Sequence, residues 1–133
     1  MKAYVLLEAM TNSAKVIRVM NDVDVMQAMY ATIGCDTVQL IPLYPDRIPK
    51  GYAALCDEDV YGKEKVFNPL ASWLYGADSH GQIVTRNAVI IKSIPEDFDF
   101  MTVEEARKIA KDLNDRAEEI FDLTVFKVFA SRQ

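Results

Sequence analysis

The side chains with the widest chemical repertoire lie in one segment, residues 66–91. This segment contains the only tryptophan and the only histidine of the chain, together with an arginine that is followed by an asparagine. Aromatic rings stack on flat ligands, a guanidinium pairs with anions, and an amide hydrogen-bonds the polar edge of a ring. These residue types predict a site for a small anionic ligand of the nucleotide kind. The candidate residues are Asn68, Ser72, Trp73, Tyr75, His80, Arg86 and Asn87.

The local pattern predicts how this segment folds. Asn68 before Pro69 is typical of a helix start, and Gly76 is typical of a helix end. We expect a short helix, an exposed turn over residues 78–81 and a buried strand over residues 87–92. Free amide groups at the helix start favour negative charge, and Arg86 would add to it. The plainer interpretation is that Trp73 belongs to the core, so that the chain is a structural module without a ligand; both interpretations stay open.

A catalytic site finds little support in the sequence. A Ser-His-Asp arrangement would need His80 with Asp78 and a nearby serine, Ser72 or Ser79, but no nucleophile elbow surrounds either serine. Glycine-rich phosphate loops and CxxC pairs are absent from the sequence. We therefore expect no enzymatic activity and no cofactor.

A metal site is likewise not expected. Carboxylates gather near the middle of the chain, and their oxygens suit Mg²⁺ or Ca²⁺, but they lack the spacing of a calcium loop. A solvated turn is the preferred interpretation. The residues concerned are Asp57, Glu58, Asp59 and Glu64.

Length and composition predict one domain over residues 1–133, with half of the residues hydrophobic. No apolar run reaches the ~18 residues of a membrane span, and Glu8 interrupts the apolar stretch near the N-terminus. We expect a cytoplasmic protein. Cys35 and Cys56 are isolated, which fits free, buried thiols in a reducing compartment.

The net charge of −5 disfavours direct binding to nucleic acid. Residues 96–122 hold ten acidic and four basic side chains. An acidic helix over residues 102–121 could mimic DNA, and this gives the alternative function of a protein-binding inhibitor of host defence. A solvated helix face is the plainer explanation.

Hydrophobic periodicity predicts an α+β domain: a mainly antiparallel sheet of five to six strands, two main helices and one short helix. We expect a hairpin over residues 2–8 and 15–20, a first helix over residues 25–33 that Asn21 and Asp22 cap, and further strands over residues 37–43 and 52–56. Residues 93–100 are expected to be a connector.

The C-terminal third shows the clearest pattern. Thr102 and Glu105 form a capping box at the start of the longest helix, residues 102–121, and residues 123–129 alternate as in a final strand. The expected inward stripe is Ala106, Ile109, Ala110, Leu113, Ala117, Ile120 and Phe121.

Several short motifs in this order resemble a small domain family of unknown function that is common in phages and mobile elements. They are Leu55-Cys56-Asp57-Glu58-Asp59, Phe67-Asn68-Pro69-Leu70-Ala71-Ser72, Leu74-Tyr75-Gly76 and Asn87-Ala88-Val89-Ile90-Ile91. The resemblance covers about residues 1–92. It implies a phage accessory protein of the host cytoplasm, one that counters host defence. Joined with the candidate site, it predicts a non-enzymatic protein that sequesters a nucleotide-like ligand, as a homo-oligomer with pockets at subunit boundaries.

Overall fold

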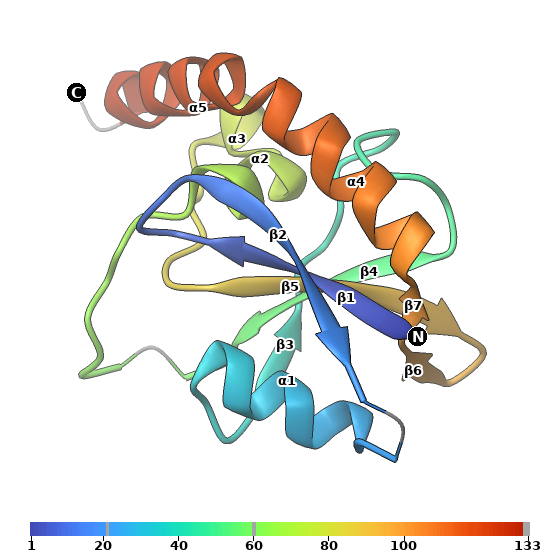
Figure 1. Cartoon of the computed structure of the whole chain (residues 1–133). Helices are drawn as coiled ribbons and strands as arrows, with labels where there is room; N and C mark the ends of the chain where they lie inside the picture. Colours follow the sequence, from blue (N-terminus) through green and yellow to red (C-terminus); the bar gives the residue numbers. More distant parts are fainter. Residues whose placement is uncertain (21, 60, 132–133) are drawn as a thin grey trace.

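The computed structural model describes residues 1–20, 22–59 and 61–131. It is an α+β fold with an antiparallel sheet, as predicted (Figure 1). The central strand order is β2-β1-β5-β4-β3; β6 pairs with β5, and β7 pairs with β1. The strands are β1 (Lys2–Glu8), β2 (Ser13–Val19), β3 (Val38–Leu40), β4 (Tyr52–Asp57), β5 (Ala88–Ile94), β6 (Asp97–Asp99) and β7 (Met101–Thr102).

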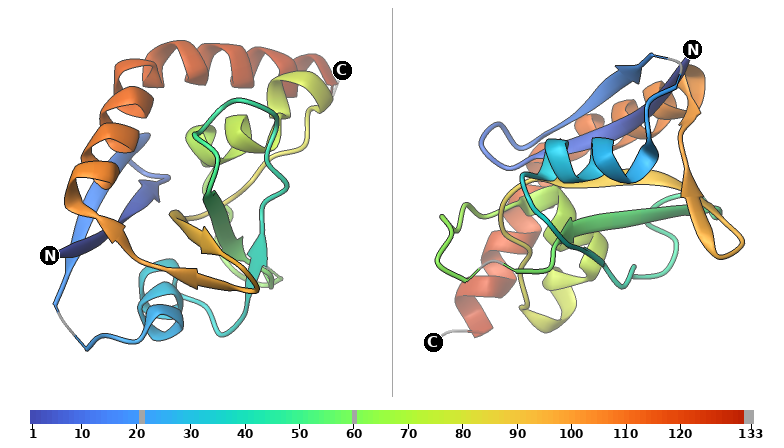
Figure 2. Two further views of the ribbon diagram at one scale, coloured as in Figure 1. Left: turned by 90° about the vertical axis from the view of Figure 1, so that its right-hand side faces the viewer. Right: turned by 90° about the horizontal axis from the view of Figure 1, so that it is seen from below.

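Helices cover both faces of this sheet. On one face, α1 (Val25–Ile33) contributes Met29 and Ile33 to a core with Tyr4 and Val89 of the central strands. On the other face lie α2 (Pro69–Tyr75), α3 (Ala77–His80), α4 (Val103–Asp115) and α5 (Ala117–Ser131) (Figure 2). The central strands therefore bury both faces, which explains why β5 reads as a continuous apolar run.

The first helix begins later than expected. Asp24 caps α1 by accepting a hydrogen bond from the Gln27 amide at 3.0 Å, so Asp22 is not the cap; Asn21 lies outside the described residues. Gly34 ends α1 in the left-handed conformation, with φ of 79°. The expected strand over residues 37–43 is limited to β3, because Pro42 cannot donate to a strand ladder.

Two expected irregular segments are ordered elements. The prediction of a connector over residues 93–100 is wrong. The strand β5 continues to Ile94, and the chain turns back into β6, with Glu96 at a φ of 61°. The expected exposed turn at residues 78–81 is instead the one-turn helix α3, which Gly81 ends. A tight turn and a one-turn helix differ by as little as one hydrogen bond, so the sequence alone does not distinguish them well.

The prediction of one helix and a final strand at the C-terminal end of the sequence is wrong. The predicted helix over residues 102–121 divides at Arg116, and the predicted strand over residues 123–129 is part of α5. Ile120 and Thr124 lie one turn apart and are buried, and the Thr124 hydroxyl donates to the Ile120 carbonyl at 2.7 Å. Phe121, expected in the inward stripe, is 40% exposed. The segment is apolar at both helical and strand spacing, so packing against α2 and α3 decides its state.

No helix in the described part of the chain is long and apolar enough to cross a membrane.

Candidate functional site

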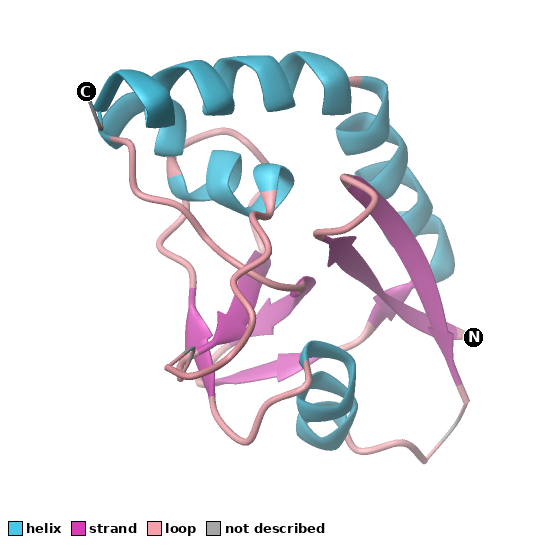
Figure 3. Cartoon of the chain, turned by 90° about the vertical axis from the view of Figure 1, so that its left-hand side faces the viewer, coloured by secondary structure: helices cyan, strands magenta, loops and turns pink. Residues whose placement is uncertain are grey.

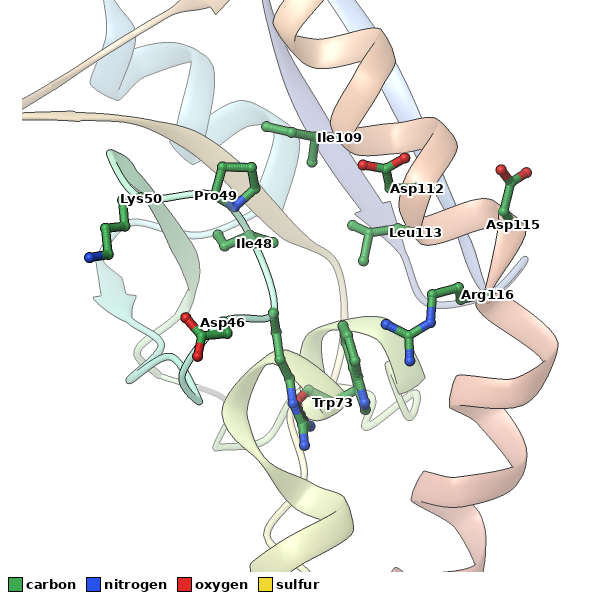
Figure 4. A pocket seen from close by; sticks show the side chains of 11 residues that line it. Asp46, Ile48, Pro49, Lys50, Trp73, Ile109, Asp112, Leu113, Asp115 and Arg116 are labelled. Atoms are coloured by element: carbon green, nitrogen blue, oxygen red, sulfur yellow. Dashed lines mark hydrogen bonds between the residues drawn. The ribbon is translucent and has the colours of Figure 1, made fainter.

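A groove of about 660 Å³ opens between the loop that precedes β4 and the corner where α4 meets α5 (Figure 4). Trp73 of α2 lies between the two walls. The volume falls within the usual range of ~300–1,000 Å³ for small-molecule sites. The lining residues are Asp46, Arg47, Ile48, Pro49, Lys50, Trp73, Ile109, Asp112, Leu113, Asp115 and Arg116.

Trp73 is held in place by the short helix α2. The Asn68 side chain caps this helix, and the apolar stripe of the helix packs into the core. The guanidinium carbons of Arg47 and Arg116 lie 4.6 and 4.8 Å from the centre of the indole ring. Both cations are thus within reach of the electron-rich face of tryptophan, the best ring for such contacts.

The two arginines differ in how firmly they are held. Arg47 donates two hydrogen bonds to the Asp78 carboxylate, at 2.5 and 3.0 Å, and one to the Trp73 carbonyl at 2.5 Å. It also lies over the Tyr44 ring at 4.2 Å. The Arg47 side chain is therefore fixed in place, and its charge is neutralised by Asp78.

Arg116 is held more loosely. Its nearest carboxylate in the described chain is Glu119 at 3.8 Å, and both side chains are about half exposed. An exposed pair at this distance contributes little. Arg116 is therefore a cation of the groove with capacity for a ligand.

Acidic side chains limit the charge that the groove can accept. Its lining contains three cations, Arg47, Lys50 and Arg116, and three carboxylates, Asp46, Asp112 and Asp115. In Figure 4, Asp112 and Asp115 project from α4 above Arg116. The local balance suits a ligand with one anionic group better than a polyanion.

Two of the predicted site residues are structural ties. The amide of Asn68 accepts from the Ala71 amide at 3.0 Å and donates to the carbonyls of Leu7 and Arg86 at 3.0 and 2.8 Å. Ser72 both donates to and accepts from the Val84 backbone. Asn68 and Ser72 are buried, so the start of α2 is closed to an anion.

Tyr75 and His80 meet each other away from the groove. Their ring centres are 4.6 Å apart. The Nδ1 atom of His80 accepts from the Gln82 amide at 3.0 Å, which leaves Nε2 to donate to the Tyr75 carbonyl at 2.9 Å. Both imidazole nitrogens are thereby engaged within the loop, and a Ser-His pair does not form among the described residues.

Arg86 and Asn87 also stabilise the fold elsewhere. Arg86 lies 3.9 Å from the Asp57 carboxylate, which is fully buried and is also bound by Lys63 at 2.7 Å. Arg86 adopts a φ of 68° and approaches the carbonyl of Gly34 at 3.4 Å. Asn87 accepts from the Ala9 amide at 3.0 Å. Of the seven predicted residues, Trp73 alone lines the groove.

The Asp57 carboxylate is engaged with other residues. Within residues 1–20, 22–59 and 61–131, no group of three or more His, Cys, Asp or Glu side chains is placed to hold an ion. Asp57 binds Lys63 and accepts from the Asp59 amide at 2.9 Å, so its oxygens have other partners.

Neither cysteine is activated. Burial raises the pKa of Cys56 to about 11, and burial, followed by the Asp57 charge, raises the pKa of Cys35. Both thiols stay protonated at neutral pH and are poor nucleophiles.

The acidic segment does not form a uniform negative face. Along α4, basic side chains lie between the acidic pair at the start, Glu104 and Glu105, and the acidic residues near the end, Asp112 and Asp115. Lys111 also binds Asp115 at 2.5 Å. This mixture of charges favours the plainer interpretation of a solvated helix face, and the DNA-mimic alternative stays a prediction. The basic residues interspersed here are Arg107, Lys108, Lys111 and Arg116.

Sequence reasoning missed Arg47 and Arg116. Arg47 lies in a proline-rich loop and Arg116 follows a helix, and neither position carries a local motif. Comparison of the chain with protein-family models, with curated proteins and with solved structures found no match. The resemblance to a phage domain family stays a prediction.

Proposed function

We propose that the protein is a non-enzymatic binder that sequesters a small ligand with a flat ring and one anionic group, such as a nucleoside monophosphate or a cyclic mononucleotide. The observation that carries this proposal is the groove in which Arg47 and Arg116 both lie over Trp73. It combines an apolar wall with few, well-placed charges, as small-ligand sites do.

The groove divides the work of recognition between its walls. Ile48 on the loop is partly exposed and offers apolar surface for a ring, next to the small exposed parts of Ile109 and Leu113 on α4 (Figure 4). Arg116 supplies a planar guanidinium for a phosphate oxygen. The fixed pair of Arg47 and Asp78 keeps Trp73 in place without competing for the anion.

The acidic rim sets the preference within nucleotides. Asp112 and Asp115 line the groove together with Arg116. Their negative charges repel each additional phosphate group of a ligand that Arg116 binds. The groove should therefore favour AMP and cyclic AMP over ATP. The lining contains no serine, cysteine or histidine, which favours binding without turnover. The resemblance of residues 1–92 to phage domains is what favours a role in removing a nucleotide signal of host defence.

The only tryptophan of the chain makes this proposal directly testable. We expect the fluorescence of Trp73 to change on titration with AMP or cyclic AMP, and calorimetry to give the same dissociation constant. Arg116→Gln should weaken binding about tenfold, since a hydrogen bond to a charged group contributes ~1.5–3 kcal/mol. Arg107→Gln, on the exposed surface of α4 outside the groove, is the matched control and should leave binding unchanged.

Two results would overturn the proposal. One is the absence of both heat and fluorescence change with AMP, cyclic AMP, ATP and cyclic dinucleotides. The other is equal weakening by Arg116→Gln and Arg107→Gln, which would indicate nonspecific attraction to a charged helix.

A further inference from the structure

The outer side of α5 carries large apolar side chains that no described segment covers. Phe126 is 78% exposed and Leu123 is 46% exposed. Figure 3 shows α5 along the outside of the molecule, with α2 and α3 beneath it. Ile120 and Thr124 face those helices and are buried. The inward side of α5 is thus satisfied, and the exposed side chains lie on a different side.

The exposed residues have the spacing of a helix-pairing seam. Leu123 and Phe126 are three residues apart, which places them next to each other on one face. Asp122 directly precedes Leu123 and Lys127 directly follows Phe126, so the two charges flank this pair on the helix surface. Among the described residues, neither charge takes part in an ion pair.

We propose that α5 pairs side by side, in parallel, with α5 of a second copy of the chain. Leu123 and Phe126 then occupy the a and d positions of one heptad, and Asp122 and Lys127 occupy g and e. In a parallel pair, a g residue meets the e residue five positions further along the other helix. Asp122 of each copy therefore meets Lys127 of the second copy, and symmetry forms this ion pair twice.

The same geometry sets the strength of the pair. One turn earlier, Glu119 occupies the preceding d position and faces Glu119 of the second copy, which opposes association. A single pair of 15-residue helices also buries less than the ~1,200 Å² of a standard interface. We expect a reversible dimer with a dissociation constant on the order of tens of micromolar. The inference rests on the exposed residues of α5 and needs no ligand in the groove.

Sedimentation equilibrium of the full chain, from about 1 μM to about 1 mM, tests the contact. The wild type should change from monomer to dimer over this range, and Phe126→Ser should remain a monomer with an unchanged circular dichroism spectrum. The matched control is Met10→Ser, because Met10 in the β1–β2 turn is 79% exposed. It should associate like the wild type. A wild type that is monomeric throughout, or equal loss in both variants, overturns the proposal.

Charge variants test the parallel arrangement. Lys127→Asp should weaken the dimer about tenfold, because it places like charges opposite each other twice. Adding Asp122→Lys to it should restore most of the affinity. Glu119→Gln should tighten the dimer several-fold by removing the repulsion between the two copies of Glu119. Failure of the double variant to recover, or no effect of Glu119→Gln, overturns the parallel pairing.

Discussion

The helices α4 and α5 follow each other with Arg116 between them, and they differ in how completely they bury their apolar residues. On α4, Ile109 and Leu113 face the core and the charged side chains face solvent. On α5, Ile120 is buried but Leu123 and Phe126 are exposed, so apolar residues occur on more than one side. Figure 2 shows the two helices meeting at a corner. The helix α4 packs on the sheet, whereas α5 packs mainly on the short helices α2 and α3.

The largest expected difference is between the effects of truncating one leucine on each helix. Leu113→Ala should lower the free energy of unfolding by about 2–5 kcal/mol, because Leu113 is 4% exposed and its removal leaves a cavity. Leu123→Ala should cost less than about 1 kcal/mol, because that side chain is already partly solvated. Urea denaturation of both variants, at a concentration where the chain is monomeric, measures the difference. Similar losses would show that α5 contributes to the core as α4 does.

The starts of the two helices also differ. The Thr102 hydroxyl accepts from the Glu105 amide and the Glu105 carboxylate accepts from the Thr102 amide, both at 3.1 Å, which completes a capping box on α4. At the start of α5, the Arg116 carbonyl accepts from the Ile120 amide at 2.8 Å.

Thr102→Ala should therefore destabilise the protein by about 1 kcal/mol. Thr102→Ser keeps the hydroxyl and is the control in the same denaturation experiment, with little expected change. If the serine variant loses as much stability as the alanine variant, the methyl group of Thr102 and not its capping hydroxyl stabilises the protein.

Sequence reasoning succeeded on α4 and failed on α5 for the same physical reason. The capping box and the separation of charged from apolar side chains show the helical period of α4 in the sequence itself. Residues 123–129 lack such markers, and their apolar residues fit alternation and helical spacing alike. The α+β class with its antiparallel sheet could be predicted because it rests on the strands and on α4.

The site was harder to predict than the fold. Trp73 could be singled out as the only tryptophan, but Arg47, Arg116 and Asp78 come from three separate elements, and only tertiary packing brings them together. Asn68 and Arg86 have side chains typical of binding sites, yet they tie buried backbone and a buried carboxylate. Residue type predicts which chemistry is available, whereas packing decides where it is used.

A hydrogen bond between Tyr52 and Glu105 connects α4 to the sheet and makes its contribution depend on pH. Burial, followed by the Glu105 hydrogen bond, raises the pKa of Tyr52 from 10.0 to about 12. The same hydrogen bond is the main cause that lowers the pKa of Glu105 below its ordinary value of 4.5. A raised tyrosine pKa stabilises the fold below pH 10, and this contribution is lost as the pH rises toward 12. A lowered carboxyl pKa stabilises it above pH 4.5, and this contribution is lost as the pH falls.

Tyr52→Phe should accordingly destabilise the protein by less than about 1 kcal/mol at neutral pH, since both partners are partly exposed. The difference from the wild type should be largest between about pH 5 and pH 10 and should decline on both sides. Denaturation midpoints of the two proteins, measured from below about pH 5 to above about pH 10, test this dependence. A constant difference from acid to alkaline pH would show that only the packing of the Tyr52 ring matters.

The smallest effect is expected on the outer face of α4, although its ion pair is short. Lys111 binds Asp115 at 2.5 Å, one turn further along the helix, but their side chains are 74% and 59% exposed. Water and salt screen such a pair, and a carboxylate near the C-terminal end of a helix opposes the helix dipole. Lys111→Gln should therefore leave the denaturation midpoint unchanged at both low and high salt. A loss as large as that of Thr102→Ala, removed by salt, would mean that the charged face of α4 stabilises the fold alongside its apolar stripe, and the contrast with α5 would then rest on charge as well as on burial.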